Sequence, residues 1–499
     1  MRIAAYVYPG WHPIPERDLA VRPGFTEWEL VAACRPRFPG HVQPQVPLLG
    51  PYDDRDPVEV GRRVRLAREH GVDAFVYGTF WCRGKRVFEE ALDQGFLGSP
   101  EGQEAPFAVM WANRLPRHVL PVRRADLPVI ADERRVPSDV DDFVAFVAHL
   151  AERYFARPNY LKVEGRLYLS IFDSTFFCRE LGLEQAAEAV RRARAWLREH
   201  GLPDLFLAAV DPSAEVIGRL SEVGFDSVTH YVLLPDWTGP RQQDYRVMAA
   251  RRAQEWAGYA AASGLPYMPS VSPAWDASPR AADFGPERPD KYPWSPVVTG
   301  EHPRRFRRAL ARALGYARST RPDDPLVFVA SLNEWSEGHH LEPDARFGLG
   351  WLEALRDARR PRGLQGPWAR AVLAWLLLIV AESVHGTLRQ VLLAPLLGDL
   401  PARRWSMLTG AALILGVAWL TSRFVGLSAR RALLGVGALW VVLTAAFEVA
   451  LGRWALGYPW ARILEDYDLS RGGLMGLGLL WLLFAPLLAA RLRGRFAAR

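Results

Sequence analysis

Cysteine is scarce in this sequence, which holds only Cys34, Cys82 and Cys178 among 499 residues. Their number is odd, and no pair has the close spacing of metal ligands. This argues against a disulfide framework or a zinc site and fits a reducing compartment. The N-terminal residues contain no apolar stretch of the length of a signal-peptide h-region, so we expect no signal peptide.

Nucleotide-binding patterns are also missing. No G-x-G-x-x-G or Walker sequence follows a strand-like run, and Gly10, Gly24 and Gly40 are typical turn glycines. The adjacent His339 and His340 lack the i, i+4 spacing of helical metal ligands. We therefore expect no metal and no other cofactor.

Lysine is absent from residues 367–499, and acids are few there. This stretch has fourteen arginines and six acids, a net charge of +8, whereas residues 1–366 carry −1. The total of +7 therefore comes from the C-terminal part. The N-terminal part lacks the positive charge on which nucleic-acid binding depends, so we expect no nucleic-acid partner.

Long apolar runs distinguish the C-terminal part. Each reaches about 20 residues, the length that a helix needs to cross the bilayer core. The runs lie near 370–394, 405–423, 431–451 and 472–490. Twelve arginines flank them on one side and six on the other. The positive-inside rule then predicts an integral membrane protein of the bacterial inner-membrane type, with the soluble domain and both termini in the cytoplasm.

The first apolar run also contains ionisable residues. Glu382, His385 and Arg389 follow one another at helical spacing and share one face. Such groups inside a membrane mark either a functional site or an ion pair that fixes helix packing, and both interpretations stay open.

The N-terminal 350 residues alternate short apolar runs with amphipathic segments such as Val58 to His70 and Glu184 to His200. The alternation predicts an α/β fold with a parallel sheet, and eight units favour a (β/α)8 TIM-type barrel. A doubly wound sheet is the alternative. The eight runs lie near 2–9, 73–80, 106–112, 167–172, 205–210, 227–232, 267–272 and 326–331.

These patterns divide the chain into four parts. We expect a barrel domain, a basic linker, an all-α domain of about four transmembrane helices, and a basic tail. The corresponding ranges are 1–355, 356–369, 370–490 and 491–499.

The segment Asn333–Gly338 carries two carboxylates three residues apart, Glu334 and Glu337, directly after the last apolar run. Cleavage of a bond between sugars uses one acid at the leaving oxygen and a second carboxylate that supports the developing positive charge. We therefore take both glutamates as candidate catalytic residues. The alternative is that they only cap or flank a loop.

Other strand-like runs also end in aromatic or ionisable residues. In a barrel these ends meet at one face, where they would form a cleft with aromatic surfaces for sugar rings and polar groups for hydroxyls. The expected substrate-binding residues are Tyr8, Trp11, His12, Trp81, Trp111, Asn113, Asp211, His230, Tyr231, Trp275, Asp276, Asn333 and Trp335.

Several of these residues belong to longer stretches that resemble the WbsX-type proteins, which are related to glycoside hydrolase family 99. The resemblance covers residues 3–350 in the expected order. The matching stretches are 6–12, 24–28, 40–44, 111–113, 154–155 with 159–160, 275–276, and 333–338 with 341–343.

The resemblance implies a (β/α)8 barrel that acts on α-linked mannose-type glycans with retention. It implies that Glu334 acts as a base on the sugar's own 2-hydroxyl, giving an anhydrosugar, and that Glu337 is the acid/base at the glycosidic oxygen. The family commonly has a glutamate and a nearby tryptophan after Trp-Ala-Asn. Here Arg114, Leu115 and Pro116 follow Asn113, which changes the charge of that rim.

We therefore expect a membrane-anchored carbohydrate-active enzyme, a retaining glycoside hydrolase whose substrate is a glycan or a lipid-linked oligosaccharide of surface-polysaccharide assembly. A membrane tether would raise its effective concentration near such a substrate. One alternative is a glycosyltransferase or transglycosylase of polysaccharide biosynthesis. Another is a catalytically silent glycan-binding module coupled to the membrane domain.

Overall fold

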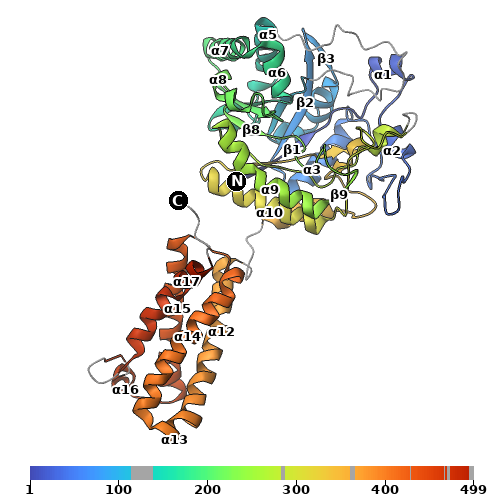
Figure 1. Ribbon diagram of the computed structural model, residues 1–499. Helices are drawn as coiled ribbons and strands as arrows, with labels where there is room; N and C mark the ends of the chain where they lie inside the picture. Colours follow the sequence, from blue (N-terminus) through green and yellow to red (C-terminus); the bar gives the residue numbers. More distant parts are fainter. Residues whose placement is uncertain are drawn as a thin grey trace. The chain divides into compact units, whose positions relative to one another are not determined.

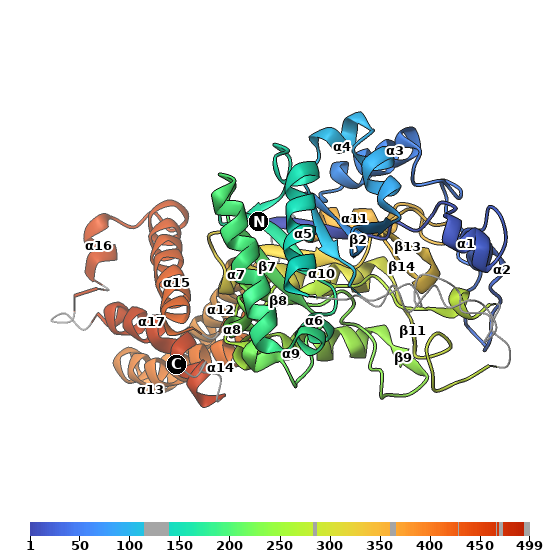
Figure 2. The same cartoon turned by 90° about the horizontal axis from the view of Figure 1, so that it is seen from above.

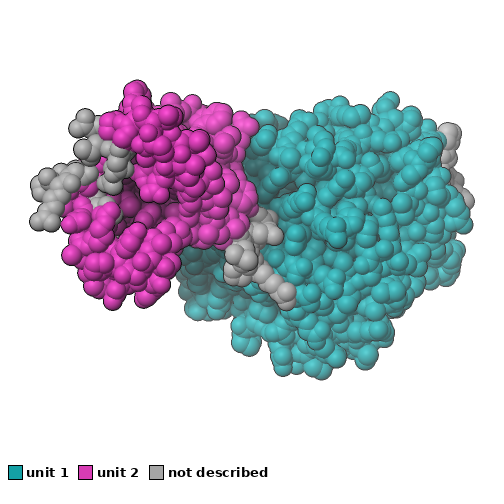
Figure 3. Space-filling view, turned by 90° about the horizontal axis from the view of Figure 1, so that it is seen from below, with its two compact units in different colours: residues 1–360 teal, residues 361–499 magenta. Residues whose placement is uncertain are grey.

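The computed structural model describes residues 1–113, 139–282, 287–359, 366–427, 429–465, 467–468 and 473–493. The chain divides into two compact units, residues 1–360 and 361–499 (Figure 3). The departure from the family pattern at 114–116 lies outside the described residues. Helix α11 (Gly350–Arg359) contains residues 356–359 of the expected linker.

Eight parallel strands form the core of the first unit, in the order β10-β12-β1-β2-β4-β6-β7-β8. Val228 of β8 bridges Tyr267, shortly before β10, so the sheet closes on itself. The predicted TIM-type barrel is confirmed, and the doubly wound alternative is wrong because an open sheet would leave these two edges apart. The strands are β1 (Arg2–Val7), β2 (Ala74–Cys82), β4 (Phe107–Trp111), β6 (Arg166–Ile171), β7 (Leu205–Val210), β8 (Ser227–Thr229), β10 (Ser270–Val271) and β12 (Leu326–Val329).

Helices follow most of the strands and lie around the outside of the barrel (Figures 1 and 2). Helix α3 begins where it does because the Asp56 side chain accepts hydrogen bonds from the first backbone N–H groups, and because Pro57 fits the first helical position. The principal helices are α3 (Pro57–Glu69), α5 (Val140–Leu150), α7 (Leu183–Glu199), α9 (Tyr245–Ser263) and α10 (Pro303–Thr320). The amphipathic segments expected at 58–70 and 184–200 are α3 and α7.

The barrel interior is filled by large side chains, as expected for this fold. The Phe328 ring from β12 lies 5.2 Å from the Tyr6 ring of β1 and 5.7 Å from the Tyr168 ring of β6. All three side chains are fully buried. The interior is therefore a solid core, and any ligand must bind at an end of the barrel.

A short hairpin follows β12. Strand β13 (Asn333–Glu334) pairs antiparallel with β14 (His339–His340) through a tight turn at Trp335–Glu337. Gly338 ends the turn with φ = +69°, and a Cβ there would approach the Asp276 backbone to 2.9 Å. Only glycine fits both demands. The hairpin brings Glu334 and Glu337 together at the carboxyl end of β12.

The described residues of the second unit form four long helices: α12 (Pro367–Leu388), α14 (Asp399–Val425), α15 (Arg430–Ala450) and α17 (Met475–Leu492). Within the part of the chain that the structure describes, four helical stretches, at 367–397, 405–425, 430–455 and 475–492, have the length and composition needed to cross a membrane. This agrees with the four predicted runs. Within the unit, His385 Nε2 lies 2.8 Å from the Thr409 hydroxyl, and Glu382 Oε2 lies 3.5 Å from His385 Nδ1.

Candidate active site

A cavity of about 750 Å³ lies at the carboxyl ends of the barrel strands. Residues on each of the eight strands or in the loops that follow them line it, among them Tyr8 after β1, Asp211 after β7 and Trp275 after β10. Glu334 and Glu337 line the same cavity. This is the end at which TIM-type barrels carry their active sites.

Arg280 links the two glutamates. Its Nη1 donates a hydrogen bond to Glu337 Oε1, and its Nη2 lies 3.3 Å from Glu334 Oε1. The Tyr292 hydroxyl donates a second hydrogen bond to Glu337, at 2.8 Å. The Ser336 hydroxyl donates to Glu334, also at 2.8 Å. The glutamates therefore flank a single guanidinium group on the cavity wall.

A second layer of charge holds Arg280 in place. Its Nε lies 3.1 Å from Glu27 Oε2, and the other Glu27 oxygen accepts hydrogen bonds from Arg17 and from the Tyr8 hydroxyl. Burial alone would raise the pKa of Glu27, but Arg280 and Arg17 outweigh burial and lower it. The guanidinium is therefore held by a third, ionised carboxylate in addition to the two glutamates of the hairpin.

The two glutamates have opposite electrostatic environments. Burial raises the pKa of Glu334 well above its ordinary value, and the neighbouring Glu337 charge adds to this increase against the attraction of Arg280. Burial would also raise the pKa of Glu337, but Arg280 and hydrogen bonds from His339 and Tyr292 lower it to about 2. The pKa values of the two carboxyl groups are thus moved in opposite directions, that of Glu334 upward and that of Glu337 downward, which is the kind of separation that acid–base catalysis on sugars needs.

Five of the thirteen expected binding residues line the cavity: Tyr8, Asp211, His230, Tyr231 and Trp275. Asp211 has a left-handed backbone, φ = +48°, and its Oδ1 accepts the Tyr231 N–H at 3.2 Å. His230 is buried against Tyr267, and burial together with Arg252 lowers the pKa of its imidazole to about 3. It is therefore a neutral hydrogen-bonding group.

Four expected tryptophans are not among the lining residues, because their rings pack into the protein. Trp11 donates its indole N–H to the Asn333 carbonyl at 3.0 Å, and Trp335 donates to Glu342 at 2.7 Å. Trp81 donates to Asp142 at 3.0 Å. Trp111 packs on Phe143 and Phe146. They support the site from behind, and their prediction as cavity residues is corrected.

Three expected polar residues likewise do not line the cavity, because their side chains form hydrogen bonds within the protein. The Asn113 side chain bonds both the N–H and the C=O of Asp173, and Asn333 does the same for Tyr8. Asp276 is held by His41 at 2.8 Å and Gln43 at 2.6 Å. All three are buried and fix the loops that carry cavity residues.

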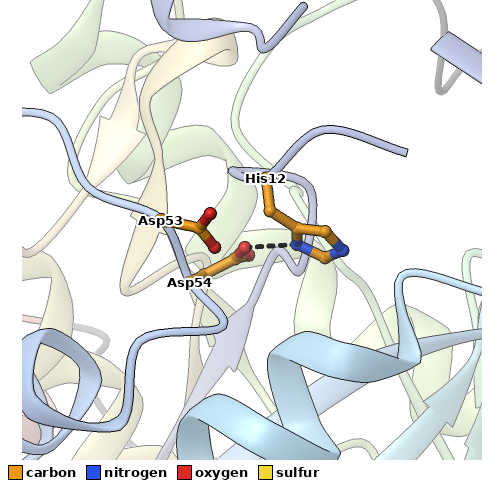
Figure 4. A group of neighbouring side chains, drawn as sticks. All are labelled: His12, Asp53 and Asp54. Atoms are coloured by element: carbon orange, nitrogen blue, oxygen red, sulfur yellow. Dashed lines mark hydrogen bonds and ion pairs between the residues drawn. The ribbon is translucent and has the colours of Figure 1, made fainter. Parts of the chain in front are cut away.

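His12 is the eighth residue that does not line the cavity. It is fully buried, and its Nδ1 lies 2.5 Å from Asp54 Oδ1 (Figure 4). With Asp53 these residues have ligand atoms within 4.8 Å of one another, a spacing that suits a metal ion. However, Asp53 is already bound by Arg55, at 2.6 Å, and Asp54 by His12. We assign no metal to this group.

Sequence reasoning missed several residues that line the cavity, among them Arg280, Tyr292 and Trp237. Arg280 lies in the short helix Ser278–Ala281, and Trp237 and Tyr292 lie in loops, so no strand-like run precedes them. Trp237 is 54% exposed, and its ring meets that of Trp275 edge-on at 5.2 Å. No periodic signal could have identified them.

Comparison with known proteins places residues 3–355 in a family model described as "Glycosyltransferase WbsX". Two curated proteins of Xanthomonas campestris pv. campestris, each described as "Uncharacterized protein WxcX", are 32% identical to this chain over 405 and 408 residues. The alignments cover 77% of this chain and 54% of each relative. The chain thus spans about half the length of these relatives.

The solved structures that match this chain have lower sequence identity to it than the two curated relatives. A GH99 endo-alpha-mannosidase from Bacteroides thetaiotaomicron is 15% identical, with a TM-score of 0.44, and the match covers 72% of this chain and 98% of that chain. A protein described as "Glycoside hydrolase-like protein" is also 15% identical, with a TM-score of 0.45 and coverage of 72% and 94%.

Proposed function

The chain belongs to the WbsX glycosyltransferase family, and we propose that it is a membrane-anchored enzyme that cleaves α-linked bonds in mannose-type or surface-polysaccharide glycans. One observation carries the proposal. Glu334 and Glu337 line one cavity, flank one guanidinium group, and have pKa values that are moved in opposite directions. Glycoside cleavage requires such a pair beside a sugar-binding surface.

The aromatic surface is provided by Trp275, Trp237 and Tyr231 around the same cavity. Their rings suit the apolar faces of sugar rings, whereas Asp211 and the neutral His230 suit hydroxyl groups. A volume of about 750 Å³ accommodates more than one sugar unit. The bond to be cleaved would lie beside the hairpin, next to Arg280.

The family-type roles require Glu334 to be ionised when it accepts the proton of the 2-hydroxyl, and Glu337 to be protonated when it donates to the leaving oxygen. In the ligand-free site the pKa shifts of the two groups favour the opposite arrangement, with the proton on Glu334. A substrate oxygen that enters between Arg280 and Glu337 would displace the guanidinium toward Glu334. This would raise the pKa of Glu337 and lower that of Glu334, because the nearby cation favours the ionised carboxylate.

Transfer to another sugar is the second candidate, favoured by the description of the family as glycosyltransferases. The sequence offers no nucleotide motif, so the donor would be a lipid-linked glycan rather than a nucleotide sugar. The four apolar helices would hold the barrel at the membrane where such a donor resides. We place the barrel on the cytoplasmic side on the basis of the arginine distribution.

Mass spectrometry of the products distinguishes these candidates. The full-length protein is incubated with α-mannosidic and lipid-linked oligosaccharides in heavy-oxygen water. Hydrolysis puts the label on the new reducing end, whereas transfer yields a longer, unlabelled glycan. A Glu337→Gln variant is expected to bind these glycans but to lose about 10²–10⁴-fold in turnover. A wild-type protein that binds glycans without any turnover would instead be a binding module.

A further inference from the structure

Helix α10 has two different faces. One face is apolar and packs into the barrel, with Phe306, Leu310 and Leu314 among its buried residues. The opposite face is exposed and basic, and the sequence of α10 contains no acidic residue. Helical spacing places five exposed arginines on this face, and we call them the α10 arginine face: Arg304, Arg307, Arg308, Arg312 and Arg318.

The charges of the α10 arginine face are not neutralised by the protein. Within the described residues, the only salt bridge of α10 is that of Arg305, which lies beside this face, with Asp244 at 3.6 Å. On α7, by contrast, the exposed Arg191 pairs with Glu188 at 2.7 Å. Like charges four residues apart destabilise a helix, so the stability of α10 does not explain why its arginines recur on one face.

The charge of the barrel unit is distributed unevenly. Residues 1–366 carry a net charge of −1, although the six arginines of α10 give this helix +6. A unit without net positive charge does not attract a free polyanion from a distance. A local basic face still binds an anionic surface that is held close to it, because screening in physiological salt leaves interactions over about 8 Å. The four helical stretches that have the length and composition to cross a membrane would hold a lipid surface close to the barrel.

Lipid phosphates match the chemistry of this face, because a guanidinium group binds phosphate oxygens through two parallel hydrogen bonds. We propose that the α10 arginine face binds anionic lipid headgroups and docks the barrel on the membrane surface. The five arginines extend over roughly 20 Å of the helix axis, which is enough to contact several headgroups at once.

The direction of α10 determines how the active-site cavity would then be oriented. Just before the helix, Glu301 pairs with Arg346, which follows the hairpin at the carboxyl ends of the strands. Just after the helix, Asp324 pairs at 2.6 Å with Arg2, the first residue of β1. The helix therefore runs along the side of the barrel, and docking on it would make the cavity open along the membrane surface. The proposal concerns this outer face and does not depend on the reaction in the cavity.

Quenching of a fluorophore by lipid headgroups tests this proposal. Gly315→Cys places the fluorophore among the five arginines, at an exposed position where an added Cβ meets no other residue within 4 Å. Ala145→Cys places it at an exposed position of α5, which the strand order puts on the opposite side of the barrel (Figure 1). The native cysteines are buried. The full-length protein is inserted into nanodiscs of phosphatidylcholine, with or without about 30% phosphatidylglycerol, that contain a lipid with a quencher on its headgroup.

The label at position 315 should be quenched at least threefold more in the anionic nanodiscs than in the neutral ones. Salt at about 0.5 M should remove this difference, because it shortens the screening length to about 4 Å. The label at position 145 should be quenched equally in both. Glutamine in place of all five arginines of the face should abolish the difference. A matched control, which removes the same charge from exposed positions elsewhere on the barrel, should preserve it: Arg22→Gln, Arg65→Gln, Arg179→Gln, Arg191→Gln and Arg219→Gln.

Equal quenching at position 315 in the two lipid mixtures overturns the proposal. This comparison needs no arginine variant, so it decides the question even if the quintuple variant does not fold. Loss of the difference in the matched control would assign the effect to net charge rather than to this face, and would also overturn the proposal. A response of the label to poly(U) RNA, without any difference between the lipid mixtures, would assign the face to nucleic acid instead.

Discussion

Arg280 donates a hydrogen bond from Nη1 to Glu337 on the wall of the active-site cavity, and its Nε donates a hydrogen bond to Glu27. This contact neutralises the carboxylate that the family-type mechanism needs in its protonated form. Arg280 and Glu337 nevertheless both line the cavity, so a ligand can reach this ion pair. Under the proposed function, a substrate would have to rearrange this ion pair before the bond is cleaved.

Replacing Arg280 by Gln removes the cation that lowers the pKa of both Glu334 and Glu337. Because Glu334 must ionise to act as a base, the acidic limb of kcat/KM should move to higher pH by about 1–3 units. The profile is measured between pH 4 and 9. Arg252→Gln is the control, since Arg252 lines the cavity but bonds Glu255 and the Pro235 carbonyl. An acidic limb that does not move would contradict the role of Arg280.

Trp237→Ala tests whether the exposed indole that lines the cavity binds a sugar ring. The indole is largely exposed, so its loss should not affect folding, but a sugar ring would lose its stacking surface. We expect KM to rise about three- to tenfold with little change in kcat, because stacking contributes roughly 0.5–1.5 kcal/mol. Val247→Ala, at an exposed apolar position on α9 that does not line the cavity, should change neither constant. An unchanged KM in Trp237→Ala would place the glycan elsewhere.

His230 makes stability depend on pH. Its folded-state pKa of about 3 lies below the unfolded value of about 6.5, so the unfolded chain binds the proton first as the pH falls. The folded state should therefore lose up to about 1.4 kcal/mol per pH unit as the pH falls from 6.5 toward 3. Thermal unfolding of wild type and His230→Gln is compared across this range. The difference in Tm should shift in favour of wild type as the pH rises, and a constant difference would refute the prediction.

The orientation of the protein in the membrane can be determined by labelling single introduced cysteines. The three native cysteines are buried, so they should not react with the label. Val58→Cys places an exposed thiol on the barrel, and Trp454→Cys places one near the end of the third apolar helix, on the predicted outer side. A membrane-impermeant maleimide added to spheroplasts should label only Trp454→Cys, and lysis should expose Val58→Cys. The reverse pattern would invert the proposed topology.

The barrel could be predicted because each parallel strand is buried on both faces and appears as a continuous apolar run. The sequence predicted less accurately which residues line the cavity. A residue at a strand end can face the cavity or the surrounding helices, because side chains alternate from one face to the other. Met110 and Ala112 line the cavity, for example, whereas Trp111 between them packs on Phe146 of α5. Arg280 comes from a connection without any periodic pattern, so only the folded structure reveals it.

The leaving-group dependence of two variants tests the central claim most directly. An acid is needed to expel a poor leaving group but not an activated one, whereas the base that assists the 2-hydroxyl is needed for both. Turnover is measured with an α-mannosidic disaccharide and with an aryl α-mannoside whose phenol is strongly acidic. Our account predicts that Glu337→Gln loses turnover of the disaccharide but retains most of that of the aryl mannoside, and that Glu334→Gln loses both. Retention of disaccharide turnover by both variants, or the reversed pattern, would contradict it.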